Sequence, residues 1–81
     1  MRTKRDTVNY TLYQGRRIVY HGITSNLDRR LAEHEADGKY FDGFSSSVKR
    51  TRQSARQHER EDLERYCRNH GGDLPKYNYI L

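Results

Sequence analysis

The sequence predicts a small α+β domain in which a three-stranded antiparallel sheet is flanked by helices. Two stretches near the N-terminus alternate between apolar and polar residues, which is the pattern of half-buried strands, and two later stretches have helical periodicity. A chain of 81 residues is expected to form one domain, spanning residues 1–81.

The first two strands are expected to form a hairpin. Residues 7–13 alternate, and residues 16–24 alternate again after a glycine-containing connection. A three-residue loop at 14–16 would set Tyr10 opposite Tyr20 and keep the two apolar faces together, whereas a two-residue loop would mix the faces. We therefore predict the odd loop, with Tyr10 and Tyr20 side by side on one face.

A short helix should follow the hairpin. Ser25 and Asp28 have the spacing of a capping box, so the helix is expected to begin near Asn26. It should run to about Ala36, with Gly38 as its stop.

Helical geometry separates the two adjacent arginines of this segment. Arg29 falls on the far side of the helix, in solvent. Arg30 lies on the apolar side, where an arc of roughly 100° also holds Leu27, Leu31 and His34.

The second half of the chain is more polar. Residues 40–48 indicate a third, weaker strand centred on residues 44–48, and residues 51–69 indicate a long polar helix that ends at a Gly-Gly pair. Pro75 predicts that residues 76–81 stay extended.

One carboxylate of the long helix is expected to face the sheet. Glu59 lies within about 40° of Leu63 on the helix circumference, whereas Glu61 lies almost opposite. A buried ion pair between Arg30 and Glu59 would account for both inward charges, although such a pair is often no more stabilising than an apolar one. The alternative is that both side chains serve a site.

Composition favours a polyanionic partner. Sixteen Lys and Arg against eleven acids give a net charge of +5, and only 32 % of the residues are hydrophobic. The single cysteine, Cys67, allows no disulfide within the chain and fits the cytoplasm, and with His70 it does not make a zinc site. The sequence has no apolar run of membrane-spanning length, so no membrane partner is expected.

Five segments, in order along the chain, resemble the motifs of the GIY-YIG nuclease domain family. Residues 8–10 (Val-Asn-Tyr) and 20–22 (Tyr-His-Gly) stand at the first two motifs, and residues 24–31 at the helix that carries the family's arginine. Glu59, followed by Leu63 and Tyr66, is similar to the family's glutamate helix, and residues 75–78 to its closing Pro-x-x-Asn. The first motif keeps only its tyrosine, and a histidine replaces the apolar middle residue of the second.

The resemblance implies a metal-dependent DNA endonuclease with a GIY-YIG-like fold. Arg30 would meet the charge on the phosphate, Glu59 would bind Mg²⁺ or Mn²⁺, and Asn78 would close the pocket beside Glu59 or a tyrosine. The base would be Tyr10, Tyr20 or His34. The alternative is a non-catalytic nucleic-acid-binding domain that keeps the nuclease fold.

A basic run is expected to contact the nucleic-acid backbone. With the site in place, these residues favour a groove that follows phosphates, and a partner protein or an oligomer would supply sequence specificity. The candidates are Lys49, Arg50, Arg52 and Arg56, with Arg60 one turn further along.

Overall fold

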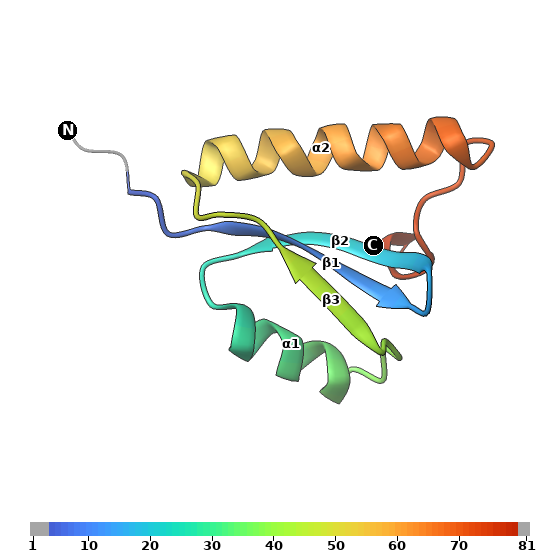
Figure 1. Ribbon diagram of the computed structural model, residues 1–81, viewed down its shortest axis with the longest axis horizontal. Helices are drawn as coiled ribbons and strands as arrows, with labels where there is room; N and C mark the ends of the chain where they lie inside the picture. The colour runs from blue at the N-terminus through green and yellow to red at the C-terminus, as the bar shows by residue number, and fades with distance from the viewer. Residues whose placement is uncertain (1–3, 80–81) are drawn as a thin grey trace.

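The computed structural model describes residues 4–79 as a three-stranded antiparallel sheet between two helices (Figure 1). The elements are β1 (Val8–Gln14), β2 (Arg17–Thr24), α1 (Leu27–Ala36), β3 (Gly43–Ser46), α2 (Arg52–Asn69) and a 3₁₀ turn, η1 (Lys76–Tyr79). The sheet has the order β2-β1-β3, and α1 and α2 lie on opposite sides of it. This arrangement confirms the predicted α+β class.

The hairpin reaches the predicted faces by a different route. A two-residue turn at Gly15 (φ 60°) joins the strands, and Tyr10 pairs with Gly22 while Leu12 pairs with Tyr20, so the predicted odd loop and register were wrong. Leu12 pairs with Tyr20 and the next residue, Tyr13, pairs with Ile18, so Val19 is an extra residue that forms a bulge in β2. The bulge puts Tyr20 on the same face as Leu12, which a two-residue loop alone would not do. Tyr10 and Tyr20 therefore lie side by side as predicted, with ring centroids 5.9 Å apart.

The N-cap of helix α1 lies one residue later than the capping box predicted. The side chain of Asn26, not of Ser25, accepts the backbone N–H of Arg29 at 3.1 Å. At the other end Gly38 has φ +82° and donates its N–H to the carbonyl of Glu35, which satisfies one of the last helical acceptors. The predicted stop at Gly38 is confirmed.

The other two predictions of local structure need correction. Strand β3 covers only Gly43–Ser46, because at Ser47 the side chain turns to bond backbone groups, including the N–H of Asn9. Residues 76–79 form a 3₁₀ turn instead of the predicted extended segment, with the N–H of Asn78 donating to the Pro75 carbonyl. Proline fixes φ at a helix-compatible value, which suits the start of such a turn. The last two residues of that prediction, 80–81, lie outside the described part of the chain.

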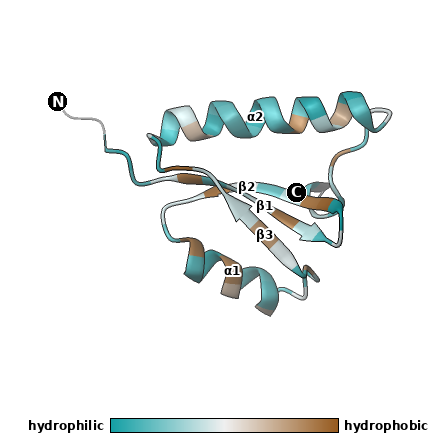
Figure 2. Ribbon diagram, in the orientation of Figure 1, coloured by the Kyte–Doolittle hydropathy of each residue, from teal (hydrophilic) through white to brown (hydrophobic). Residues whose placement is uncertain are grey.

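The core is small and lies mainly between the sheet and α1. Tyr10, Leu12 and Val19 are almost fully buried, and Leu27 and Leu31 of α1 pack against them. Figure 2 shows α2 as hydrophilic along most of its length. No helix within residues 4–79 is long and apolar enough to cross a membrane.

Polar contacts hold the start of α2 to the sheet. Asn9, which is buried, donates from its side chain to the carbonyl of Ala55 at 2.8 Å and accepts from the guanidinium of Arg50 at 2.7 Å. Ala55 is itself fully buried against the sheet. An asparagine at this strand position therefore ties the sheet, the connection after β3 and the first turns of α2 together.

A second asparagine fastens the C-terminal turn to the outer edge of β2. The Asn78 side chain accepts the backbone N–H of His21 at 2.9 Å and donates to the His21 carbonyl at 3.0 Å. Both backbone groups lie on an edge of the sheet that no strand of the described chain covers. The side chain thus replaces a missing strand neighbour.

Replacing Asn78 with Ala should destabilise the protein by about 1–3 kcal/mol, because two half-buried backbone groups lose their partners. The free energy of unfolding in urea measures this loss. The matched control is Asn69→Ala at the exposed end of α2, which should change stability by less than about 0.5 kcal/mol. Equal effects of the two substitutions would contradict the role given to Asn78.

Candidate functional site

Two tyrosines and a histidine meet on the α1 side of the sheet. The hydroxyl of Tyr10 on β1 lies 2.6 Å from Nε2 of His34 on α1. The ring of Tyr20 on β2 meets the His34 ring edge-on, with centroids 4.7 Å apart. Tyr10 and His34 are each only 2 % exposed, whereas Tyr20 is half-buried. Of the three side chains, Tyr20 is the one that solvent reaches most easily.

Gly22 gives the tyrosines the space that they occupy. A Cβ atom at this position would lie 2.6 Å from Cε2 of Tyr20 and 2.7 Å from the hydroxyl of Tyr10, both too close for any side chain. Tyr10 cannot swing aside because it is buried and bonded to His34. Glycine is therefore required here by the close approach of two rings.

Arg30 lies beside these hydroxyls with part of its guanidinium in solvent. Its side chain is 41 % exposed and forms an ion pair with Glu33, one turn along α1, at 3.3 Å. The neighbouring Tyr10 hydroxyl raises the pKa of Arg30, and Tyr20 and Glu33 act in the same direction. The ion pair suggested between Arg30 and Glu59 was wrong, since Glu33 takes that place.

The protons in this cluster follow from burial. Burial lowers the pKa of His34, helped by Lys39 and Arg30, so the ring is neutral at pH 7. Burial and the nearby Tyr20 raise the pKa of Tyr10, which keeps its proton. The direction of the bond between Tyr10 and His34 follows the tautomer of the neutral ring: Tyr10 donates to Nε2 when the ring proton is on Nδ1, and accepts from Nε2 in the other tautomer. The Nδ1 atom of His34 is buried without a hydrogen-bond partner in the described chain.

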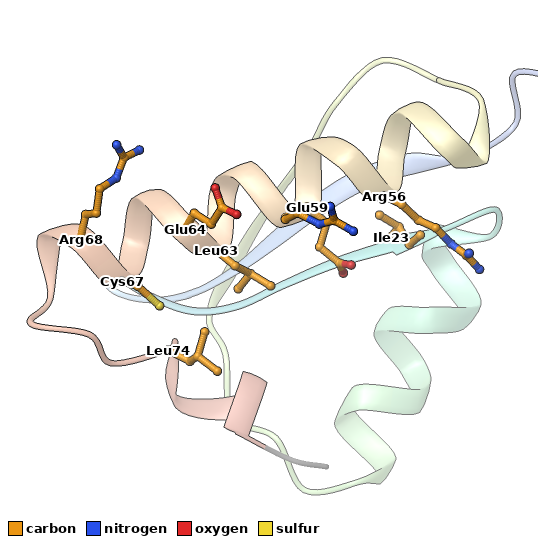
Figure 3. A pocket seen from close by; sticks show the side chains of 9 residues that line it. Ile23, Arg56, Glu59, Leu63, Glu64, Cys67, Arg68 and Leu74 are labelled. Carbon is orange, nitrogen blue, oxygen red and sulfur yellow. The ribbon is translucent and has the colours of Figure 1, made fainter.

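Glu59 lies in a groove on the α2 side of the sheet (Figure 3). The groove has a volume of about 770 Å³, and Ile23 of β2 lines it beside Glu59. Burial raises the pKa of this carboxyl, and Arg56 opposes the shift. Within residues 4–79 Glu59 forms no ion pair, so the half-buried carboxylate has no structural partner.

The tyrosine cluster and the Glu59 groove meet at one edge of the sheet. Gly22, under the Tyr10 hydroxyl, and Ile23, in the groove, are consecutive residues of the edge strand β2. Their positions face opposite sides of the sheet, one residue apart. A ligand lying along this edge can therefore approach both groups of side chains. Asn78 bonds His21 at the same edge and neither Glu59 nor a tyrosine, which corrects its predicted contacts.

A divalent cation would have one protein ligand in this arrangement. Residues 4–79 contain no cluster of three or more histidine, cysteine or acidic side chains placed to hold a metal. Mg²⁺ commonly keeps several waters and binds one or two carboxylates together with substrate phosphates. Glu64 also lines the groove, and in Figure 3 its carboxylate points away from that of Glu59. Glu59 therefore fits the mode with a single carboxylate ligand, and it does not fit a site built wholly from protein.

The predicted nucleic-acid contacts divide into two groups. Arg52 and Arg56 lie on one exposed stretch of α2, and Lys49 is exposed just before it. Arg50 is half-buried and donates to Asn9, so part of its guanidinium is already engaged in the fold.

Two features of the site were not predicted. Glu33 pairs with Arg30, and the three-residue spacing on a helix was the available signal for that pair. The clearance that Gly22 provides depends on two rings from different strands, so no local pattern indicates it.

Comparison of the chain with protein-family models, with curated proteins and with solved structures gives no match.

The substitution Gly22→Ala should destabilise the protein by about 1–3 kcal/mol, because the added methyl overlaps the rings of Tyr10 and Tyr20, and Tyr10 is buried and bonded to His34. Urea unfolding measures the change. Gly43→Ala is the matched control on β3, since its Cβ would meet only Tyr13 at 4.0 Å. A Gly22→Ala protein as stable as the Gly43→Ala protein would show that the tyrosines pack differently.

Stability should fall as the pH drops below ~6.5, the ordinary histidine pKa. The pKa of His34 is lowered in the folded state, so its contribution is complete above the unfolded pKa and is lost as pH falls through the folded one. Burial lowers the pKa of His21 as well, which adds to the effect. The unfolding free energy should be measured at several pH values above about 5.5. Its slope against pH should be smaller in His34→Gln than in the wild type, and smaller still in His21→Gln/His34→Gln. An unchanged slope in both variants would contradict the assignment.

Proposed function

We propose that this protein is a metal-dependent endonuclease of the GIY-YIG type that hydrolyses phosphodiester bonds in DNA. The observation that carries the proposal is the pairing of Tyr10 with His34, with Tyr20 and Arg30 beside them. Gly22 of β2 lies under this cluster, and the next residue, Ile23, lines the groove that holds Glu59. Buried aromatic hydroxyls, a half-exposed arginine and an unpaired carboxylate at one sheet edge are the parts that phosphodiester hydrolysis needs.

Tyr20 is the group that we assign to the attacking water. It is half-buried, whereas Tyr10 and His34 are almost inaccessible to solvent. A tyrosine hydroxyl that acts as a base needs a nearby cation to stabilise its ionised form, and Arg30 supplies one. Tyr20 would first release its own proton to solvent, which reaches this half-buried side chain. The Tyr10–His34 pair holds the surrounding side chains in place.

Arg30 and Glu59 have separate tasks. The exposed part of the Arg30 guanidinium offers a planar pair of donors to the phosphate as its negative charge grows. Glu59 would hold Mg²⁺ or Mn²⁺, an ion that steadies the leaving oxygen when bound. Burial raises the pKa of Glu59, so metal affinity should fall in mildly acidic solution as the carboxylate is protonated.

A non-catalytic DNA-binding domain with the same fold is the second candidate. The first motif keeps only Tyr10 of its three residues, and Asn9 serves the fold there by joining the sheet to α2. Binding by this domain would use the exposed basic residues of α2 without the cluster on the other side of the sheet. Either protein fits the cytoplasm, where a lone cysteine stays reduced.

The decisive experiment is cleavage of supercoiled, branched and single-stranded DNA with Mg²⁺ or Mn²⁺, and then with EDTA. Glu59→Gln and Arg30→Ala should each lower the cleavage rate by about 10²-fold or more, because each removes charge stabilisation from the reacting phosphate. Tyr20→Phe should abolish cleavage if Tyr20 is the base. Tyr10→Phe should reduce cleavage less, because the Tyr10 hydroxyl holds His34 in position and does not itself contact the attacking water.

Matched controls come from neighbouring side chains. Glu61→Gln lies on the exposed side of α2, and Arg29→Ala on the exposed side of α1, so both should retain full cleavage. Metal-dependent cleavage that survives both Glu59→Gln and Arg30→Ala would refute the site. DNA binding without cleavage of any substrate would favour the second candidate.

A further inference from the structure

Three arginines form a row along α2 that the fold does not use. Arg52, Arg56 and Arg60 follow at four-residue spacing, so each rises about 6 Å above the last. All three are exposed, and within residues 4–79 none of them forms a salt bridge. Like charges at this spacing repel one another along a helix. Glu59 offsets part of this repulsion at Arg56, and a bound anion would relieve the rest.

The row leads into the groove that holds Glu59. Arg56 and Arg60 line both this groove and a second, more polar one beside Arg52, so they stand on the ridge between the two. Figure 3 shows Leu63, Cys67 and Leu74 turned toward one another at one end of the groove, with Arg68 pointing away. The groove therefore has an apolar floor, which includes Ile23, Leu63 and Leu74, and a polar rim. Three arginines line this rim together with the carboxylates of Glu59 and Glu64.

We propose that this groove binds a single-stranded segment of a polynucleotide. Its phosphates would lie on the row of Arg52, Arg56 and Arg60, and one base would rest on the floor formed by Ile23, Leu63 and Leu74. The inference rests on the proposed nuclease function in one respect, since the strand would pass Glu59 and present its phosphate there.

The shape and the charge of the groove favour a single strand over other occupants. A volume of about 770 Å³ matches pockets that enclose a small ligand, so an unstacked nucleotide can enter and a duplex cannot. A duplex exposes its phosphates and covers its base faces, which would leave the apolar floor in water. Binding of single strands combines a cationic path for the backbone with apolar contact to the bases. An acidic peptide would meet the same arginines, and the experiment includes it as a competitor.

Fluorescence anisotropy in EDTA tests the groove without chemistry. The probes are oligothymidines of about 12 nucleotides, the same length with abasic sites, the matching RNA, and a blunt duplex. The wild type should bind the intact single strand about tenfold more tightly than the abasic strand or the duplex. Arg60→Ala should weaken that binding about tenfold and lower the slope of its salt dependence by about one. Arg16→Ala in the hairpin turn removes the same charge outside both grooves, and it should bind within about twofold of wild type.

The outcomes separate this inference from the nuclease proposal. Equal affinity for intact and abasic strands, or for single strand and duplex, would overturn the base-binding floor. Displacement of the oligonucleotide by an acidic peptide at lower concentration than by unlabelled strand would assign the groove to a peptide instead. Selective single-strand binding that Glu59→Gln retains would support the groove even if no cleavage is found. Cleavage without that selectivity would support the nuclease and refute the groove.

Discussion

The 2.6 Å contact between the Tyr10 hydroxyl and Nε2 of His34 is the interaction on which the rest of the domain depends. It joins the central strand to α1 through two side chains that are almost fully buried. With so few apolar residues in the core, these polar side chains also have to fill it. The same contact fixes the hydroxyl over Gly22, where no larger residue fits. Packing and candidate chemistry therefore use the same atoms, so a change in either alters the other.

Polar joints take over where the apolar core ends. Helix α2 buries little besides Ala55 and Tyr66, and the buried Asn9 links its first turns to the sheet. The C-terminal turn depends in a similar way on Asn78 and the backbone of His21. Hydrogen bonds to buried backbone groups contribute modestly when made and are expensive to lose. The domain thus holds its outer elements with few, directional contacts, which leaves the exposed surface of α2 available to a ligand.

The edge strand β2 brings together side chains that lie on different sides of the sheet. Gly22 lies beneath the tyrosines and Ile23 lines the Glu59 groove, and the two residues are adjacent in the chain. If β2 were a central strand, a neighbouring strand on each side would prevent a ligand from reaching both of its faces. Because β2 is an edge strand, one ligand can contact side chains on both of its faces. Arg30 of α1 and Glu59 of α2 could therefore act on the same ligand.

By itself, the sequence determined the two strands of the hairpin, the two helices and their inward faces. The alternation in the hairpin placed Tyr10 with Tyr20, the helical period distinguished Arg30 from Arg29, and Gly38 ended α1, because each depends on neighbours within a few residues. Only the tertiary structure decided the hairpin register, the clearance at Gly22 and the contacts of Asn78. Each depends on a bulge, on two rings from different strands or on a distant strand edge, none of which a local pattern indicates. Side chains choose among partners by distance in the folded chain, and sequence spacing does not give that distance.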